Sequence, residues 1–272
     1  MTSQTPPARQ LRRRIDLLDL QGCGVYSEDR VAITVLFQFP WMALLRSNGA
    51  WICGGTLINV RYVLTAAQCI KDTTIDTVRL GEFDLNQAID CFPRAECAPI
   101  PQDIAIERTI IHEQYSVRRK ANDIALLRLV HAATENENVI PICLPVTPEM
   151  QPAVATYYVA GWGTREYKKH SNVLHHTKLI LVSKDECQMQ IRKEERLVPI
   201  FDTQVCARSV NNHSDYCSAD AGGPLKSLGK NGRLVQYGVV SFGLSSCGKQ
   251  SSVGVYTRVE SFIDWILDKL ED

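Results

Sequence analysis

Short apolar runs, separated by turns that carry glycine, proline or polar residues, limit what this chain can fold into. Each run is too short for a typical helix, and the regular alternation of runs and turns is typical of β-sandwiches and β-barrels. We therefore expect an all-β domain. The runs cover residues 39–45, 51–58, 62–65, 77–80, 104–111, 124–129, 156–160, 178–182, 234–242 and 254–258.

Only two segments have the pattern of a helix. Ser183 stands directly before Lys184-Asp185-Glu186, where its hydroxyl can accept a hydrogen bond from a free amide of a first helical turn. The second segment, residues 259–270, repeats apolar residues at helical spacing and predicts a helix with one buried face at the C-terminus. The residues of this face are Phe262, Ile263, Ile266, Leu267 and Leu270.

Composition describes an ordinary globular protein and excludes several kinds of partner. The chain has 272 residues, of which 45% are hydrophobic, and its 30 basic and 30 acidic residues give a formal net charge of zero. A neutral chain has no long-range attraction for nucleic acid or for an anionic membrane. No apolar run approaches the roughly 20 residues that a membrane-spanning helix needs.

Ten cysteines indicate an oxidising compartment, where disulfides form and persist. Free or metal-bound thiols are the alternative, but no Cys-x-x-Cys pair occurs in the chain. The sequence starts Met1-Thr2-Ser3-Gln4 without an apolar signal region. Because disulfide chemistry and a missing signal peptide conflict, we expect an N-terminally incomplete chain of a secreted, extracellular protein.

Three motifs identify the family. Residues 215–224 read Asp-Tyr-Cys-Ser-Ala-Asp-Ala-Gly-Gly-Pro, residues 64–69 read Leu-Thr-Ala-Ala-Gln-Cys, and residues 122–127 read Asn-Asp-Ile-Ala-Leu-Leu. Together they resemble the active-site motifs of the chymotrypsin-like and trypsin-like serine proteases. The resemblance places Ala221 at the position of the nucleophilic serine, Gln68 at that of the general base and Asp123 at that of the orienting carboxylate.

Two of these three positions lack the side chain that the chemistry needs. The methyl group of Ala221 has no lone pair with which to attack a carbonyl. The amide of Gln68 does not titrate near neutral pH, so it cannot accept a proton from a nucleophile or return one to a leaving amine. Asp123 is retained, but it has no chemistry of its own. We therefore expect a catalytically inactive homologue.

The resemblance implies two six-stranded antiparallel β-barrels and a C-terminal α-helix over residues 31–272. Residues 1–30, with the solvated run Arg12-Arg13-Arg14, resemble the linker of the arthropod clip-domain type, whose clip module is absent from this chain. The cysteine pairs that the resemblance implies are Cys53–Cys69, Cys187–Cys206, Cys217–Cys247, Cys23–Cys143 and, by remaining for each other, Cys91–Cys97.

Activation by cleavage is also altered. The resemblance places the cleavage site at Arg30-Val31 and makes Asp220 the ion-pair partner of the freed α-ammonium. That insertion uses a flexible glycine close to the new terminus, and this chain has no glycine between Val31 and Gly49. Without glycine a buried turn is restricted to ordinary backbone regions. We expect insertion to fail even if Arg30 is cleaved.

A pocket for a basic side chain is the part of the cleft that the resemblance retains. Asp215 stands at its base and Gly243 and Gly254 form its walls, so that a guanidinium or ammonium would meet a carboxylate. Ala219 replaces the glycine whose amide helps to hold the oxyanion. Asn212, in Asn-His-Ser, is an acceptor sequence for N-glycosylation near the outer wall.

No metal site is expected. His213 and the adjacent His175 and His176 are ligands by type only, and we interpret them as surface histidines. The loop from Glu82 to residue 96 is acidic, and calcium sites occur near this position in relatives. Its spacing matches no defined motif, so we expect solvated acidic side chains and no cofactor. The acidic residues are Glu82, Asp84, Asp90 and Glu96.

The expected function is protein binding. By resemblance, an inactive homologue of this type is a cofactor or regulator of an extracellular protease cascade in immunity and melanisation, with an active protease, a zymogen or a recognition protein as partner. One alternative is an inactive mutant or derivative of a trypsin-like endopeptidase that cleaves after Arg or Lys. Against an engineered mutant, the positions of Ala219 and Phe242 also differ from the family pattern, and inactivation would not require changing them. A hydrolase with another nucleophile is the second, but no cysteine or threonine adjoins Ala221 as a substitute.

Overall fold

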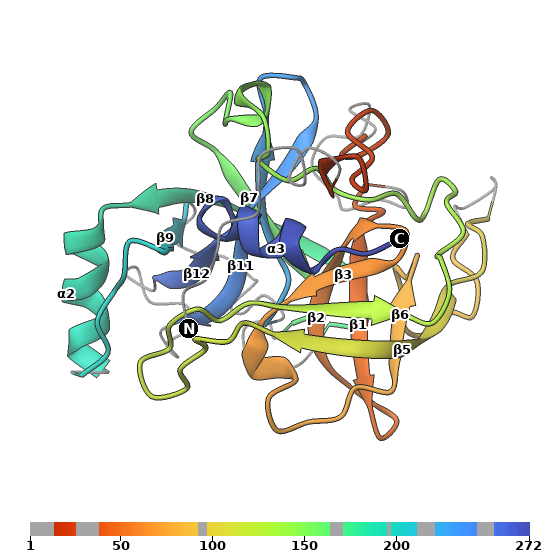
Figure 1. Cartoon of the computed structure of the whole chain (residues 1–272), viewed down its shortest axis with the longest axis horizontal. Helices are drawn as coiled ribbons and strands as arrows, with labels where there is room; N and C mark the ends of the chain where they lie inside the picture. Colours follow the sequence, from red (N-terminus) through yellow and green to blue (C-terminus); the bar gives the residue numbers. More distant parts are fainter. Residues whose placement is uncertain are drawn as a thin grey trace.

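The computed structural model describes residues 14–25, 38–91, 97–163, 171–194, 197–210, 221–243 and 253–272. Its strands close two barrels of six strands each, and all neighbouring strands run antiparallel. The barrels lie side by side in Figure 1. The prediction of two six-stranded antiparallel barrels is confirmed.

The first barrel has the order β1-β2-β3-β6-β5-β4. Its strands are β1 (Met42–Ser47), β2 (Ala50–Asn59), β3 (Tyr62–Thr65), β4 (Thr77–Leu80), β5 (Gln102–Ile111) and β6 (Ala125–Leu129). The second barrel has the order β10-β11-β12-β9-β8-β7. Its strands are β7 (Tyr157–Gly161), β8 (His175–Val182), β9 (Gln204–Ser209), β10 (Pro224–Leu228), β11 (Leu234–Gly243) and β12 (Gly254–Arg258).

Two strands were not predicted from the sequence, and one was misplaced. The strands that the apolar pattern missed are β9 and β10, in which polar side chains such as Gln204 and Lys226 are buried. The Gln204 amide has one local and one distant partner, because it accepts from the backbone of Phe201 at 3.0 Å and donates to the Lys120 carbonyl at 2.7 Å. The run predicted at 39–45 corresponds to β1, which begins only at Met42.

The helices follow the sequence pattern closely. In α2 (Lys184–Glu194), the Ser183 hydroxyl accepts a hydrogen bond from the Glu186 amide at 3.2 Å, as the sequence predicted. The C-terminal segment begins as a 3₁₀ turn, η4 (Val259–Phe262), and continues as α3 (Ile263–Lys269). Ile266 and Leu267 are buried in the hydrophobic core that contains most of the first barrel. In Figure 1, α3 lies between the two barrels, so it helps to join them.

The described part of the N-terminal segment, residues 14–25, packs on the barrels. Leu18 is buried, and Gly24 donates a backbone hydrogen bond to Pro141 at 2.8 Å and accepts one from Leu234 at 2.9 Å. Arg14 forms an ion pair with Asp268 at 2.7 Å. These contacts attach the segment to elements that are far apart in the sequence.

Four of the five expected disulfides lie among the described residues, and the structure forms all four. They are Cys23–Cys143, Cys53–Cys69, Cys91–Cys97 and Cys187–Cys206. The fifth, Cys217–Cys247, lies outside the described residues.

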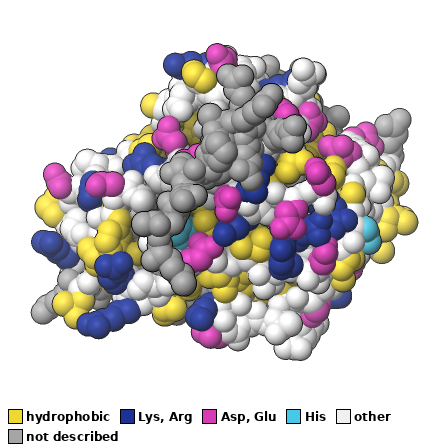
Figure 2. Space-filling model, in the orientation of Figure 1, with side chains coloured by type: hydrophobic (Ala, Val, Ile, Leu, Met, Phe, Trp, Pro, Cys, Tyr) yellow, Lys and Arg dark blue, Asp and Glu magenta, His cyan; other side chains and the backbone are white. Residues whose placement is uncertain are grey.

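The surface in Figure 2 carries basic and acidic side chains interspersed over the first barrel, which fits the zero net charge of the chain. Several of them are paired, as in Arg61–Glu107 and Arg79–Asp103. No helix in the described part of the chain is long and apolar enough to cross a membrane.

The disulfides should differ in their contribution to stability according to the length of chain that they close. Cys23 and Cys143 are 120 residues apart, whereas Cys91 and Cys97 are six apart. From loop-closure entropy, replacing both cysteines of the first pair by serine should lower the free energy of unfolding by about 5 kcal/mol, and the same change in the second pair by about 2 kcal/mol. Urea titration of both variants measures the difference, and equal losses would contradict this explanation.

Candidate functional site

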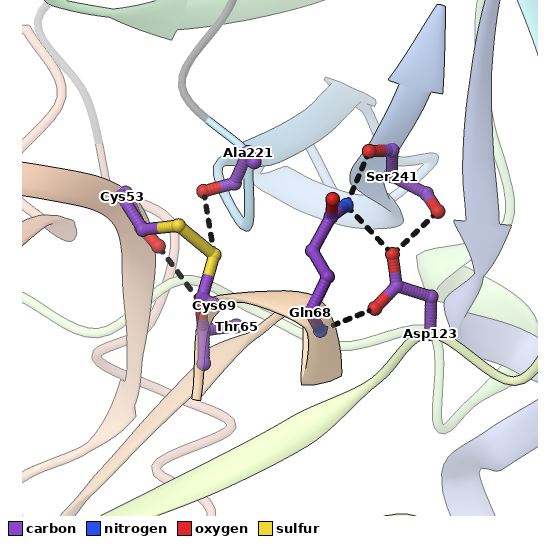
Figure 3. The surroundings of a disulfide bond; sticks show 8 residues. Cys53, Thr65, Gln68, Cys69, Asp123, Ala221 and Ser241 are labelled. Atoms are coloured by element: carbon purple, nitrogen blue, oxygen red, sulfur yellow. Dashed lines mark hydrogen bonds between the residues drawn. A yellow bond between two sulfur atoms is a disulfide. The ribbon is translucent and has the colours of Figure 1, made fainter. Parts of the chain in front are cut away.

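Asp123 occupies the centre of the site, at the junction of the two barrels (Figure 3). The residue is 2% exposed, and three hydrogen bonds hold its carboxylate. The Ser241 hydroxyl donates at 2.6 Å, the Gln68 backbone amide at 2.9 Å and the Gln68 side chain at 2.8 Å. Burial raises the pKa of the Asp123 carboxyl, and the donated hydrogen bonds oppose that rise. Asp123 therefore links Gln68 of the first barrel to Ser241 of the second.

Gln68 uses its side-chain amide as a double donor. Besides Asp123, its Nε2 donates to the carbonyl oxygen of Ser241. Both neighbours are acceptors, so the amide nitrogen and not the oxygen must face them. A primary amide has two N–H groups, and both are used here. Gln68 is a neutral, fixed donor with no proton to exchange.

Ala221 lies on a turn that retains a demanding backbone geometry. Its carbonyl accepts a hydrogen bond from the Gly54 amide at 2.9 Å, and the Cys69 disulfide sulphur lies 3.5 Å from the same oxygen. Gly222 has φ 87°. A side chain at Gly222 would bring its Cβ within 2.2 Å of the Thr65 hydroxyl oxygen, so only glycine fits. The turn is held in place although the Ala221 side chain is only a methyl group.

The sequence placed Gln68, Asp123 and Ala221 in one site, and the structure brings them together as Figure 3 shows. The two proposed pocket walls also meet, because Gly243 and Gly254 are paired across β11 and β12. A Cβ on Gly254 would lie 2.8 Å from the Tyr256 hydroxyl, so the second wall leaves little space. The remaining site residues lie outside the described residues: Arg30, Val31, Asn212, His213, Asp215, Ala219 and Asp220.

Sequence reasoning missed three contributors to the site. Ser241 donates to the Asp123 carboxylate, and the Thr257 hydroxyl donates to the Asp123 carbonyl at 2.7 Å. The Lys120 ammonium lies 4.6 Å from the centre of the Phe242 ring, a cation–π distance, and covers the strand beside Ser241.

One of the histidines interpreted as surface residues is partly buried. His176 is only partly exposed, and it packs edge-on against Phe39 with ring centres 5.4 Å apart. Burial, with a smaller effect from the charge of Lys226, lowers the pKa of His176 to about 4. The side chain is therefore neutral at physiological pH and partly buried. No three His, Cys, Asp or Glu side chains gather into a metal site in the part of the chain that the structure describes.

The expectation of solvated acidic residues in the loop was also wrong for two of them. Glu82 and Asp90 are 6% and 5% exposed. Glu82 accepts from the Phe83 amide at 2.9 Å and from Arg79 at 3.2 Å, and Asp90 accepts from the amides of Phe83 and Asp84. Burial raises the pKa of both carboxyls. Because N–H donors occupy these oxygens, the described side chains do not fit a calcium site, which requires several free oxygen ligands. Glu96 lies outside the described residues.

Replacing Gln68 by glutamate tests the double-donor role of its amide. The Q68E carboxylate would replace a donor beside a buried carboxylate, and we expect the free energy of unfolding to fall by about 3–5 kcal/mol at neutral pH. The folded protein would raise the pKa of one carboxyl, so folding would take up a proton and the loss should shrink as the pH falls toward 4. Q68A, which removes both side-chain donors without adding a charge, is the matched control and should show a weaker pH dependence, because it raises only the pKa of Asp123. Urea titrations at several pH values measure both, and a pH-independent loss for Q68E would contradict the arrangement.

Comparison with known proteins agrees with this geometry. Residues 34–266 match the family model described as Trypsin. The chain is 40% identical over 268 residues to the CLIP domain-containing serine protease HP8 of Bombyx mori, covering 92% of this chain and 72% of that protein. It is 39% identical over 267 residues to phenoloxidase-activating factor 3 of Holotrichia diomphalia, covering 92% and 75%.

A solved structure agrees as well. The crystal structure of the Drosophila Grass clip serine protease of the Toll pathway superposes with a TM-score of 0.82 at 34% identity, covering 94% of this chain and 77% of that one. Fold, site geometry and sequence similarity thus lead to one conclusion: the chain belongs to the trypsin family of serine proteases, and clip-domain serine proteases are among its relatives.

Proposed function

We propose that this protein is a non-catalytic serine protease homologue that acts by binding other proteins of an extracellular protease cascade. The observation that carries the proposal is the double donation by Gln68, whose two amide protons are fixed by Asp123 and Ser241. A residue in this state transfers no proton, and Ala221 offers no nucleophile. Two separate requirements of peptide hydrolysis are therefore missing.

The type of cascade comes from the relatives. One is named a phenoloxidase-activating factor, and the structure of another is described as a clip serine protease of the Toll pathway. These names support a role for this chain as a cofactor or regulator in melanisation or innate immunity, with an active protease, a zymogen or a recognition protein as its partner. Four disulfides among the described residues support secretion.

The alternative, an inactive derivative of a protease that cleaves after Arg or Lys, shares the missing chemistry and differs in its biological role. Adding the purified protein to a reconstituted cascade separates the two. A regulator changes the rate at which a downstream zymogen is activated, and the change is proportional to the concentration of the regulator. The assay is carried out with the intact chain and with the chain cleaved at Arg30. A derivative without a partner leaves that rate unchanged.

We expect no measurable turnover of an arginyl amide substrate. When triad side chains are removed from active relatives of this fold, the residual rate is about 10³–10⁴ times that of the uncatalysed reaction. Continuous assay of the purified protein measures the rate, and robust turnover that persists through further purification would contradict the proposal. The double variant Gln68→His with Ala221→Ser is the control: a gain of turnover there would show that the assay detects a restored site.

The pocket can be tested independently of catalysis. If Asp215 lies at the base of a pocket with Gly243 and Gly254, benzamidine should bind weakly through a charge-assisted hydrogen bond. Asp215→Ala should remove most of that affinity, whereas Asp185→Ala, on the exposed surface of α2, should not change it. Calorimetry measures all three proteins. Equal heats in wild type and Asp215→Ala, or none in either, would mean that the pocket is not used.

A further inference from the structure

Lys226, on β10, is a buried cation that the site does not use. Its residue exposure is 0%, and its Nζ has no hydrogen-bond partner in the described part of the chain. It pairs with Tyr158 on β7 and with Gln236 on β11, so its side chain lies on the same face of the sheet as theirs. Its neighbour Leu225 points to the opposite face, into the core of the second barrel. Lys226 is thus buried on the outside of the barrel wall.

Phe39 supplies the cover. The Lys226 ammonium lies 3.7 Å from the centre of the Phe39 ring. Phe39 is 8% exposed, packs against His176 and precedes β1, so it belongs to the segment that leads into the first barrel. The contact between Phe39 and Lys226 therefore joins the start of the first barrel to the outer wall of the second.

No acidic side chain of the described residues pairs with Lys226. Tyr158 faces it from β7, His176 from β8 and Gln236 from β11. His175, the neighbour of His176 on the strand, points to the opposite face. The described residues directly before β1, residues 38–41, contribute the Phe39 ring and no carboxylate. Among the ion pairs of the described residues none includes Lys226, and the Oε1 atom of Gln236 also lacks a partner.

Two effects act on the protonation of Lys226 in opposite directions. The Phe39 ring attracts the ammonium, while the loss of hydration disfavours it. A single ring replaces only part of the lost hydration, so desolvation dominates and lowers the pKa of Lys226 to about 7. His176 titrates near pH 4 and stays neutral over the range in which Lys226 changes its charge.

We propose that the contact between Phe39 and Lys226 is a latch, and that the buried lysine keeps this latch weak. The described residues directly before β1, residues 38–41, can then detach from the second barrel without global unfolding. The latch connects two regions of regulatory interest. On one side, Phe39 follows the expected cleavage position Arg30 by nine residues. On the other side, β10 begins three residues after Ala221. Separation of Phe39 from Lys226 removes a packing contact from each of these two regions.

The direction of the pH dependence follows from the two states. In the open state Lys226 is hydrated and has its ordinary pKa of 10.5, whereas in the closed state its pKa is about 7. Between these values the open state binds more protons, so lowering the pH favours opening by up to about tenfold per pH unit. Below pH 7 both states are protonated, and the opening equilibrium should no longer change.

Native-state hydrogen exchange tests the latch. The amide of Met42, which donates to the Phe39 carbonyl, reports on this segment. In the wild type its protection factor should rise roughly tenfold between pH 7 and 8.5. Lys226→Met keeps the length of the side chain and removes the charge, so protection at pH 7 should be at least tenfold higher and the pH dependence should vanish. His176→Phe, the control, should keep the wild-type slope.

A second measurement is independent of any variant's folding. Titration of the protein labelled with ¹³C at lysine Cε, followed by NMR, should show one lysine with a pKa near 7. A set of lysines that all titrate near 10.5 would overturn the proposal. Equal protection and equal pH slopes in the wild type and Lys226→Met would overturn it as well.

Discussion

The carboxylate of Asp123 is the interaction on which the junction of the two barrels depends. A buried carboxylate is strongly disfavoured unless donors surround it, and here three donated hydrogen bonds come from Gln68 and Ser241. A fourth, from Thr257, fixes the Asp123 backbone. The arrangement brings together β11 and β12 of the second barrel and the turn after β3 of the first. Asp123 is therefore a structural residue in this chain whether or not it orients a base.

The substitutions at the other two positions preserve the hydrogen bonding of the site. Glutamine at position 68 supplies two donors to two acceptors, and no buried acceptor is left without a partner there. Ala221 removes a hydroxyl but keeps the carbonyl that accepts from Gly54. The turn requires glycine at position 222, where φ is 87° and a Cβ would collide with the Thr65 hydroxyl. The backbone hydrogen bonds and the turn of this loop thus form without the side chain that catalysis requires.

The sequence predicted most strands because their apolar runs have local signals, and it located Gln68, Asp123 and Ala221 because their motifs are local too. It failed where burial is decided by distant partners. The Gln204 amide donates to the carbonyl of Lys120, 84 residues away, and Lys226 is covered by Phe39. A polar side chain in a short segment gives no sign of such a partner. The strands β9 and β10 were missed for this reason.

The same limit explains why the charges of two side chains were misjudged. Glu82 is buried and His176 is partly buried by groups that no local pattern reveals, so their charge cannot be judged from composition. The positions of Gln68, Asp123 and Ala221 differ in how many buried hydrogen bonds a substitution would remove. The Ala221 carbonyl accepts its hydrogen bond from Gly54 with a methyl group as the side chain, and the amide at position 68 donates to the Asp123 carboxylate and the Ser241 carbonyl. Removal of the Asp123 carboxylate would leave several buried donors without an acceptor. Of the three positions, Asp123 is thus the one at which a substitution would destabilise the fold most, although its side chain neither attacks the substrate nor transfers a proton.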